Sequence, residues 1–323
     1  LYVDGNMFTG ALPTELGLLT ALDTLMVHDN QLNGTLPTEL GNLTAMTVLS
    51  LSPNSFSGTM PTELGLMTAC QELWAHTNNF NGSIPTEIFA MPALKILNLY
   101  NNSLTGTLPT QLGALAFLET ISLEGNNLVG TLPTELGLLT ALTYLDVQTN
   151  SFTGTFPTEL GRLTELQYFY ATNNLFNGTL PKEWGQLVGL DGLFVDQNGL
   201  VGTLPTEFGQ LTGLLDLMVN DNYLVGTLPT EYGKLTSLLR VHLENNAFTG
   251  MLPMEMSQWS NAREFVFSGN NFIGSVDDIL CASHKEWDSL QGDCLAPTND
   301  QSEIECMCCT TCCNVNGENC QAM

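Results

Sequence analysis

The chain repeats one 24-residue unit twelve times between its first residue and about residue 280. A proline marks the units at constant spacing, inside a local pattern such as Gly106-Thr107-Leu108-Pro109-Thr110, and an asparagine such as Asn102 keeps the same spacing. No insertion or deletion interrupts this register. Periods of roughly 20 to 50 residues are typical of arrays in which each unit packs against its neighbours. The length therefore indicates an elongated repeat array rather than one globular core.

The unit that begins at Leu94 shows how one repeat is expected to fold. Leu97 and Leu99 alternate with polar residues, which predicts a short, half-buried strand. The apolar set continues on the return path with Leu104, Leu108, Leu112 and Leu115. One set of leucines is therefore expected to face a shared interior.

The other recurring residues predict how each unit turns. Asn102 is expected to end the strand, to satisfy backbone groups of the turn through its amide, and to stack on the equivalent asparagines of the neighbouring units in a buried ladder. Pro109 with Thr110 predicts the start of a short helical turn, and Gly113 its end.

The pattern L-x-x-L-x-L-x-x-N-x-L-x-G-x-L-P-x-x-L-G-x-L resembles the plant-type leucine-rich repeat, which is found in receptor-kinase ectodomains and polygalacturonase-inhibiting proteins. The resemblance covers residues 1–280 and implies an α/β solenoid. In this fold a right-handed superhelix carries a parallel sheet on its concave face and short 3-10 or helical turns on its convex face. A second short strand is implied near the Gly-Thr-Leu-Pro segment. We expect a solenoid at residues 1–280 without its N-terminal cap, because Leu1 falls within a strand, and a cysteine-rich cap at 281–323.

Eight of the nine cysteines crowd into the last segment, and this density predicts disulfides formed in an oxidising compartment. Cys281 and Cys294 resemble the family's paired-cysteine cap, and the ending that follows is similar to those of secreted microalgal members. A zinc cluster is the alternative, since closely spaced thiolates bind zinc. The sequence does not assign the pairing. The cysteines expected in disulfides are Cys281, Cys294, Cys306, Cys308, Cys309, Cys312, Cys313 and Cys320.

Several observations indicate a secreted or cell-surface protein. No run of 18 or more apolar residues and no signal peptide is present in the sequence, so we expect no membrane span in this segment and a leader removed upstream. Asn-x-Ser/Thr motifs predict N-glycosylation. The expected glycosylation sites are Asn33, Asn42, Asn81, Asn101 and Asn177.

Seven lysines and arginines against 33 aspartates and glutamates leave a formal charge of −26, which repels nucleic acid and anionic lipid. The acidity favours solubility, with a cationic partner as the alternative. A column of glutamates after the prolines is expected to complement exposed N–H groups in the first turn of each helix. The alternative is calcium bridging, which would need carboxylates that converge from adjacent units. We expect no cofactor, with calcium as the exception to test.

Candidate binding residues are those that the strands point away from the core, because the core positions are used for folding. Aromatic residues are frequent in these outward columns, beside polar acceptors, and this combination suits sugars or peptides. The alternative is cross-strand packing of a sheet face. The candidate ligand-binding residues on the concave face are Trp74, His76, Tyr100, Tyr168, Tyr170, Phe194, Asp196, Met218, Asn220, His242 and Glu244.

We therefore expect a non-catalytic extracellular module that recognises protein or glycan through its concave face, in adhesion or in a receptor. No nucleophile with an adjacent base and orienting group emerges from the sequence, so an enzyme is not expected. A self-assembling extracellular-matrix or appendage component is the alternative. Regular threonine columns beside the prolines leave ice binding as a minor alternative.

Overall fold

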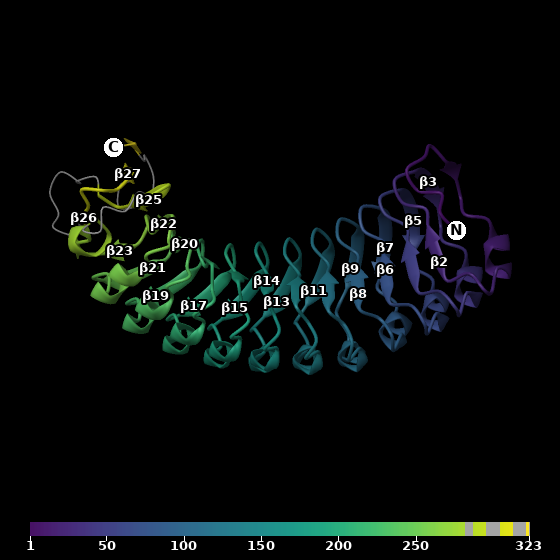
Figure 1. The fold of residues 1–323 in the computed structure, drawn as a ribbon, viewed down its shortest axis with the longest axis horizontal. Helices are drawn as coiled ribbons and strands as arrows, with labels where there is room; N and C mark the ends of the chain where they lie inside the picture. The colour runs from purple at the N-terminus through teal and green to yellow at the C-terminus, as the bar shows by residue number, and fades with distance from the viewer. Residues whose placement is uncertain (282–286, 295–303, 313–320, 323) are drawn as a thin grey trace. The chain divides into compact units, whose positions relative to one another are not determined.

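The computed structural model describes residues 1–281, 287–294, 304–312 and 321–322. The chain divides into two compact units, Leu1–Thr153 (unit 1) and Gly154–Met323 (unit 2). Within each unit a 24-residue repeat makes one coil that carries two short strands and a 3-10 helix, and the coils follow one another in chain order (Figure 1). The predicted solenoid of parallel strands and 3-10 turns is thus confirmed.

In unit 1 the Leu-x-Leu strands form one parallel sheet, which we call the first sheet. Each residue pairs with the equivalent residue of the next coil, 24 positions on, as Leu49 does with Leu73. The strands of the first sheet in unit 1 are β2 (Thr24–Met26), β4 (Val48–Ser50), β6 (Glu72–Trp74), β8 (Ile96–Asn98), β10 (Thr120–Ser122) and β12 (Tyr144–Asp146).

The glycine-containing segments form a second parallel sheet, as the resemblance implied. Here the register is different, because Ser57 pairs with Asn79, only 22 positions on. Equivalent residues are therefore displaced by two residues along the strand at each coil. The strands of the second sheet in unit 1 are β1 (Thr9–Gly10), β3 (Gln31–Gly34), β5 (Ser55–Thr59), β7 (Asn79–Ser83), β9 (Ser103–Gly106), β11 (Asn127–Gly130) and β13 (Ser151–Gly154).

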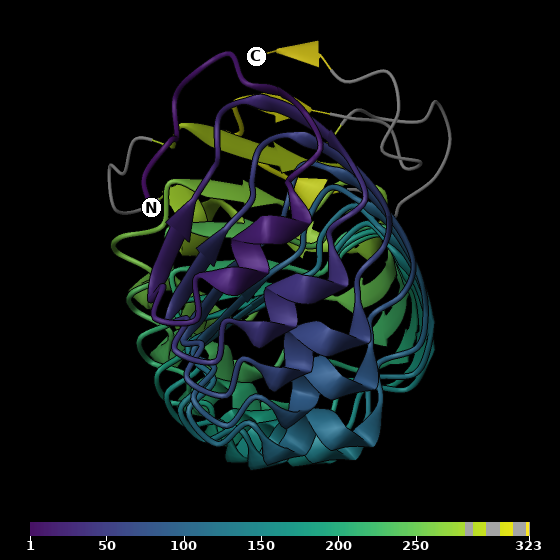
Figure 2. The ribbon, with the colours of Figure 1, turned by 90° about the vertical axis from the view of Figure 1, so that its right-hand side faces the viewer.

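A 3-10 helix follows the proline of each coil, and Figure 2 shows these helices one after another along unit 1. Pro37 is extended, with φ −70° and ψ 138°, and its carbonyl accepts the N–H of Leu40 at 3.2 Å. The fixed φ of proline thus starts the turn without a side-chain cap. The helices of unit 1 are η1 (Thr14–Leu18), η2 (Thr38–Asn42), η3 (Thr62–Leu66), η4 (Thr86–Ala90), η5 (Thr110–Ala114) and η6 (Thr134–Leu138).

The recurring glycine of these helices has a different role from the one expected. Gly113 lies inside η5 rather than at its end. A Cβ at the equivalent Gly65 would fall 2.6 Å from Cβ of Glu87 in the next coil. Glycine is therefore required because adjacent helices approach closely at this point, not because it ends the helix.

Unit 2 repeats the same plan. Its first sheet contains β14 (Tyr168–Tyr170), β16 (Gly192–Phe194), β18 (Asp216–Met218), β20 (Arg240–His242), β22 (Glu264–Val266), β25 (Ser289–Gly292), β27 (Thr311–Cys312) and β28 (Gln321–Ala322). Its second sheet contains β15 (Leu175–Gly178), β17 (Gly199–Gly202), β19 (Tyr223–Gly226), β21 (Ala247–Gly250) and β23 (Asn271–Phe272). Its helices are η7 (Thr158–Arg162), η8 (Lys182–Gln186), η9 (Thr206–Gln210), η10 (Thr230–Lys234) and η11 (Met254–Gln258).

The C-terminal segment of unit 2 continues the first sheet, since Phe265 of β22 pairs with Leu290 of β25 and Gln291 pairs with Thr311 of β27. A π-helical turn, η12 (Asp277–Cys281), precedes it. A separate pair of short parallel strands, β24 (Gly274–Ser275) and β26 (Ile304–Glu305), also joins the last repeat to the tail.

The expected leucine core is present, since Leu97, Leu99 and Leu104 are fully buried. The asparagines of the ladder from Asn30 onward are buried or half-buried, and their amides bind backbone groups of the turns, as expected. Nδ2 of Asn126 donates to the carbonyls of Leu99 and Leu123, each at 3.0 Å, and Oδ1 accepts the N–H of Leu104 at 2.9 Å. Each asparagine therefore links its own turn to the backbone of the preceding coil, which satisfies groups that have no partner in either sheet.

Candidate functional site

The candidate binding residues lie on the outer face of the first sheet, because the middle residue of each strand enters the core. In β16, for example, Leu193 is fully buried whereas Phe194 is half-buried. The candidates fall into two groups that we describe separately. Trp74, His76 and Tyr100 belong to unit 1, and the other candidates belong to unit 2.

Aromatic rings form a stacked row in unit 2. Tyr168 and Tyr170 have ring centroids 6.1 Å apart and an interplanar angle of 13°. Tyr170 and Phe194 are closer, at 4.4 Å and 12°, and Phe194 is in register with Met218 of β18. The sequence-based expectation of an apolar strip across these coils therefore matches the geometry of the rings.

Gly192 makes room for this row, and the sequence analysis did not identify it. A Cβ at Gly192 would fall 2.6 Å from Cε2 of Phe194 and 3.0 Å from Cδ1 of Tyr168. Other coils carry a side chain at this position, such as Ile96 in β8. The absence of a side chain lets the two rings settle over the backbone of β16.

A charged pair borders the aromatic row. Nε and a terminal guanidinium nitrogen of Arg240 donate to Oδ1 and Oδ2 of Asp216 at 2.6 and 2.7 Å. Asp216 is 7% exposed, whereas the Arg240 side chain is half exposed. Each residue stands directly before the buried residue of its strand, Leu217 or Val241, and therefore points to the same face as the outward residue two positions on. That alternation is a signal from which the sequence analysis could have identified them.

His242 lies between two carboxylates. Its Nδ1 is 3.5 Å from Oε1 of Glu244, and its Nε2 is 3.5 Å from Oε2 of Glu264. Burial opposes protonation, but the two glutamates outweigh it and raise the pKa of His242. The candidates His242 and Glu244 therefore lie next to one another, and Glu264 is a further residue of this group that the sequence did not indicate.

Asp196 and Asn220 complete the polar border in unit 2. Burial raises the pKa of Asp196, while a hydrogen bond from the Thr172 hydroxyl, at 2.7 Å, lowers it. Asn220 donates to Asp221 at 2.8 Å. The groups that border the row of rings are thus mainly carboxylates, and the basic side chains of Arg240 and His242 lie between them.

The group in unit 1 is a compact aromatic cluster. The His76 and Tyr100 rings stack at 4.2 Å with an interplanar angle of 8°, and Trp74 meets His76 edge-on at 6.3 Å. Nε1 of Trp74 donates to Oε2 of Glu72 at 2.9 Å, which fixes the indole. Burial lowers the pKa of His76, so this imidazole is neutral at pH 7.

A serine, a histidine and an aspartate also meet on this face, although no such group was identified from the sequence. Oγ of Ser50 lies 3.1 Å from Nδ1 of His28, and Nε2 of His28 lies 3.6 Å from Oδ2 of Asp4. The neighbouring N–H groups of Val3 and Val27 are bound to carbonyls of the next coil. The three side chains can therefore form hydrogen bonds with a ligand. The N–H groups of Val3 and Val27 already have carbonyl partners, so they are not available to bind a substrate oxygen.

The convex glutamates lie in the first turn of their helices, as expected. Where a threonine precedes the glutamate, its hydroxyl donates a hydrogen bond to the carboxylate, as Thr62 does to Glu63 at 3.2 Å. The closely spaced metal-ligand atoms found among the described residues are the sulfurs of Cys281, Cys306 and Cys308, within 4.8 Å of one another. All three sulfurs belong to disulfides, so they are not thiolate ligands.

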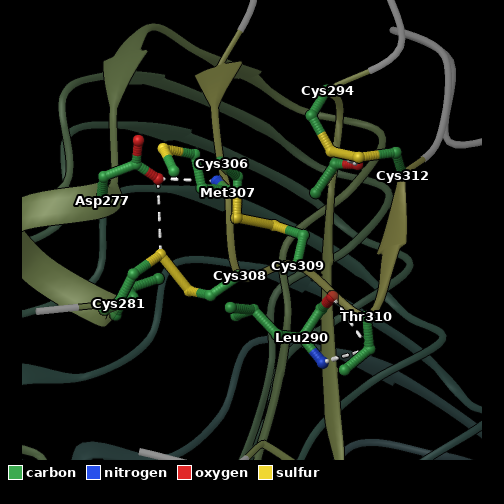
Figure 3. The surroundings of a disulfide bond; sticks show 12 residues. Asp277, Cys281, Leu290, Cys294, Cys306, Met307, Cys308, Cys309, Thr310 and Cys312 are labelled. Atoms are coloured by element: carbon green, nitrogen blue, oxygen red, sulfur yellow. Dashed lines mark hydrogen bonds between the residues drawn. A yellow bond between two sulfur atoms is a disulfide. The ribbon is translucent and has the colours of Figure 1, made fainter. Parts of the chain in front are cut away.

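Among the described residues, three disulfides stabilise the C-terminal part of unit 2 (Figure 3). The bonded pairs are Cys281–Cys308, Cys294–Cys312 and Cys306–Cys309. Cys281 and Cys294, which resemble the family's paired-cysteine cap, are each bonded to a later cysteine rather than to one another. Cys313 and Cys320 lie outside the described residues. The free thiol of Cys70 is fully buried, and burial raises its pKa to about 12.

Asn33, Asn42, Asn81, Asn101 and Asn177 are all exposed. Glycosylation at these residues stays a prediction. Asn33, Asn81 and Asn177 lie on strands β3, β7 and β15, so glycans there would cover parts of the second sheet.

A groove of about 620 Å³ lies on the other side of the coils in unit 2. Threonines of the predicted ladder, among them Thr155, Thr179 and Thr203, line it above Phe156 and Leu180. Lys182 and Glu183 also line the groove, where most other coils carry threonine and glutamate. The threonine surface is therefore hollowed here rather than flat.

Comparisons with known proteins agree with this architecture. The Leucine Rich Repeat family model matches residues 93–115, 117–139 and 141–163. The plant peptide hormone receptor RGFR1 in complex with RGF2 is 34% identical, with a TM-score of 0.82 over 83% of this chain and 43% of that chain. A TDR receptor is 31% identical, with a TM-score of 0.84 over 91% of this chain and 52% of that chain.

A plant ice-binding protein is 24% identical, with a TM-score of 0.62 over 71% of this chain and 74% of that chain, a likeness that concerns the fold alone. No curated protein sequence matches the chain. The chain spans about half the length, or less, of the two receptors. Within the described residues, no helix is long and apolar enough to span a bilayer. The chain thus carries leucine-rich repeats and is similar to plant receptor ectodomains.

Proposed function

We propose that this leucine-rich repeat chain is an extracellular recognition module that binds a peptide or protein through the first-sheet face of unit 2. The observation that carries the proposal is the stacked row of Tyr168, Tyr170 and Phe194, which is bordered by the Asp216–Arg240 pair. Rigid aromatic side chains supply contact area at a low cost in conformational entropy, and charged groups at their border select the partner.

Two further observations support a peptide or protein rather than another ligand. The rings and the polar groups repeat across consecutive strands, so they can contact an extended segment along several coils. The receptor RGFR1, to which the chain is similar, binds the peptide hormone RGF2.

The disulfide-rich C-terminal part fits an oxidising, extracellular location.

The alternative of ice binding is less favoured by the geometry of the threonine columns. The two-residue shift per coil in the second sheet adds about 6.6 Å along the strand to the roughly 4.8 Å between strands. Equivalent threonines are thus separated by about 8 Å rather than by one strand spacing. The groove beside Thr179 interrupts this surface as well.

Self-assembly into a matrix stays a second proposal, supported by the near uniformity of the helix side of the coils. Light scattering tests it. A molecular mass that grows with concentration, with or without calcium, would favour assembly, whereas a constant monomer mass would favour the recognition module.

The recognition proposal is tested with Tyr170→Ala and Phe194→Ala against a displayed library of extended peptides. Both variants should fold normally, since both side chains are half exposed, and should weaken the selected peptides tenfold or more, about 1.4 kcal/mol. Tyr223→Ala is the matched control, because Tyr223 is an exposed aromatic residue of the second sheet. Equal losses in all three variants, or none in the first two, would refute this face as the binding site.

A further inference from the structure

The first-sheet face of unit 1 contains two buried polar atoms without a hydrogen-bond partner among the described residues. These atoms are Oδ1 of Asn98 and Oγ of Ser52. Asn98 is 8% exposed and Ser52 is 4% exposed. A buried polar group without a partner is costly, so such groups are rare and indicate a partner that is missing.

Both side chains point toward the same face. Leu97 and Leu99 enter the core on either side of Asn98, so the strand alternation of β8 turns Asn98 outward. Ser52 lies two residues beyond the end of β4, directly after the buried Leu51 and at the same repeat position as His76. The two residues are two coils apart, about 10 Å by strand spacing. A ligand that satisfies both must therefore span more than one coil.

Aromatic residues lie beside Asn98 on one side, and Ser122 is in register with it on the other. Trp74 is in register with Asn98 on the neighbouring strand β6, and Tyr100 follows Asn98 on the same face of its own coil. The stacked pair of His76 and Tyr100 extends this apolar surface beside the amide. A planar apolar surface beside hydrogen-bonding groups is the combination that stacks on the C–H face of a sugar ring.

Hydrogen-bonding groups of both senses lie close to Ser52. His28 and His76 occupy the position equivalent to Ser52 in the coils before and after it, and Ser50 is hydrogen-bonded to His28. A hydroxyl can donate and accept, as can a neutral imidazole. Such a mixture matches the hydroxyl groups of a saccharide, each of which also donates and accepts.

The charge of unit 1 selects against acidic sugars. Lys95 is the one lysine in residues 1–153, which contain no arginine, and it lies 3.8 Å from Glu119. Carboxylates near the cluster include Asp4, Asp29 and Glu72. A uronate or sulfated sugar would meet repulsion here, and Lys95, which already faces Glu119, is the one lysine of this unit that could offset it.

We infer that the first-sheet face of unit 1 binds a neutral oligosaccharide of at least two rings, which stacks on Trp74 and Tyr100 and donates hydroxyl protons to Asn98 and Ser52. This site is separate from the peptide-binding face proposed in unit 2 and does not depend on it. Because the ligand is uncharged, its affinity should be nearly independent of salt.

The test uses the whole chain and a panel of neutral oligosaccharides, with uronate oligosaccharides as the charged comparison, followed by calorimetry at low and high salt. We expect binding of at least one neutral oligosaccharide, with a less than twofold change in affinity between the two salt concentrations. Trp74→Ala and Asn98→Leu should each weaken it tenfold or more. Asn98→Leu should unfold at the same temperature as the parent or higher, because it removes an unsatisfied polar group.

Phe117→Ala is the matched control, since Phe117 is an exposed aromatic residue of unit 1 that lies in neither sheet, and this variant should leave oligosaccharide affinity unchanged. The inference is overturned if no neutral oligosaccharide binds, if uronates bind more tightly, or if Asn98→Leu and Trp74→Ala bind as the parent does. Oligosaccharide binding by the parent chain without any peptide binding would count against the unit 2 proposal alone.

Discussion

Gly192 lies beneath the ring of Phe194, where a Cβ would come within 2.6 Å of Cε2. The stacked row in unit 2 therefore depends on a residue that has no side chain. Its neighbours in the same column carry large or charged groups, Tyr168 and Asp216 among them. The shape of the proposed binding face thus depends on the missing side chain at Gly192 as much as on the aromatic residues around it.

The first prediction concerns this glycine. Gly192→Val should displace the rings of Phe194 and Tyr168 and weaken the selected peptides roughly tenfold, while the cost in stability stays small because valine is favourable in a strand. Near-ultraviolet circular dichroism reports the displaced rings, and peptide affinity reports the site. Unchanged affinity together with a changed aromatic spectrum would show that the row does not bind the ligand.

A second prediction tests why each helix contains glycine. A Cβ at Gly185 would fall 2.6 Å from the carbonyl oxygen of Glu207, so Gly185→Ala should destabilise the chain by about 1–3 kcal/mol through overpacking. Gly213→Ala is the matched control. Its Cβ would meet nothing closer than 3.9 Å, and equivalent coils carry alanine, as at Ala141. Urea denaturation that gives equal losses for the two variants would contradict the close-approach explanation.

The pair of Asp216 and Arg240 supports a third prediction. Arg240→Ala leaves a carboxylate that is 7% exposed without its bidentate partner, which should cost about 1–3 kcal/mol. Adding Asp216→Asn to that variant should restore part of the loss, because the unpaired charge is removed. Thermal unfolding of the single and double variants gives the coupling. Additive losses would indicate that the pair is screened by solvent and contributes little.

The fourth prediction is a pH dependence. Burial raises the pKa of Asp146 to about 6, against hydrogen bonds from Gln148 and Tyr144 that lower it. Since the folded pKa lies above the unfolded value near 3.9, the unfolded chain loses this proton first as pH rises. The associated stability is therefore present below about pH 4 and is lost between pH 4 and pH 6, on the order of 3 kcal/mol.

Asp146→Asn should remove this pH dependence, so its stability relative to the parent should increase from pH 4 to pH 6 and then stay constant. Denaturant unfolding at a series of pH values checks this. A difference between variant and parent that does not change with pH would show that Asp146 titrates near its ordinary value.

The strict period predicted the coil, its strands, its 3-10 turn and the buried leucines. In a stacked array each unit packs against the same kind of neighbour, so the apolar positions that recur in every unit are the core positions. It also predicted that the outward columns carry the candidate residues. It missed Gly192, Arg240 and Glu264. These residues stand at the first position of their strands, outside the columns that were searched for aromatic and polar side chains, and a glycine or a charged residue there has no distinctive pattern. It also gave no sign that Ser50, His28 and Asp4 meet.

The sequence by itself determined that this chain stacks 24-residue coils with leucines inside, an asparagine ladder, and a disulfide-rich end. The reason is that these features follow from local periodicity and composition. The tertiary structure alone decided the 22-residue register of the second sheet, the pairing of Cys281 with Cys308, and the unsatisfied amide of Asn98. Each of these depends on how side chains and backbone of different coils meet in space, and a repeat pattern that treats all coils as equivalent contains no information about that.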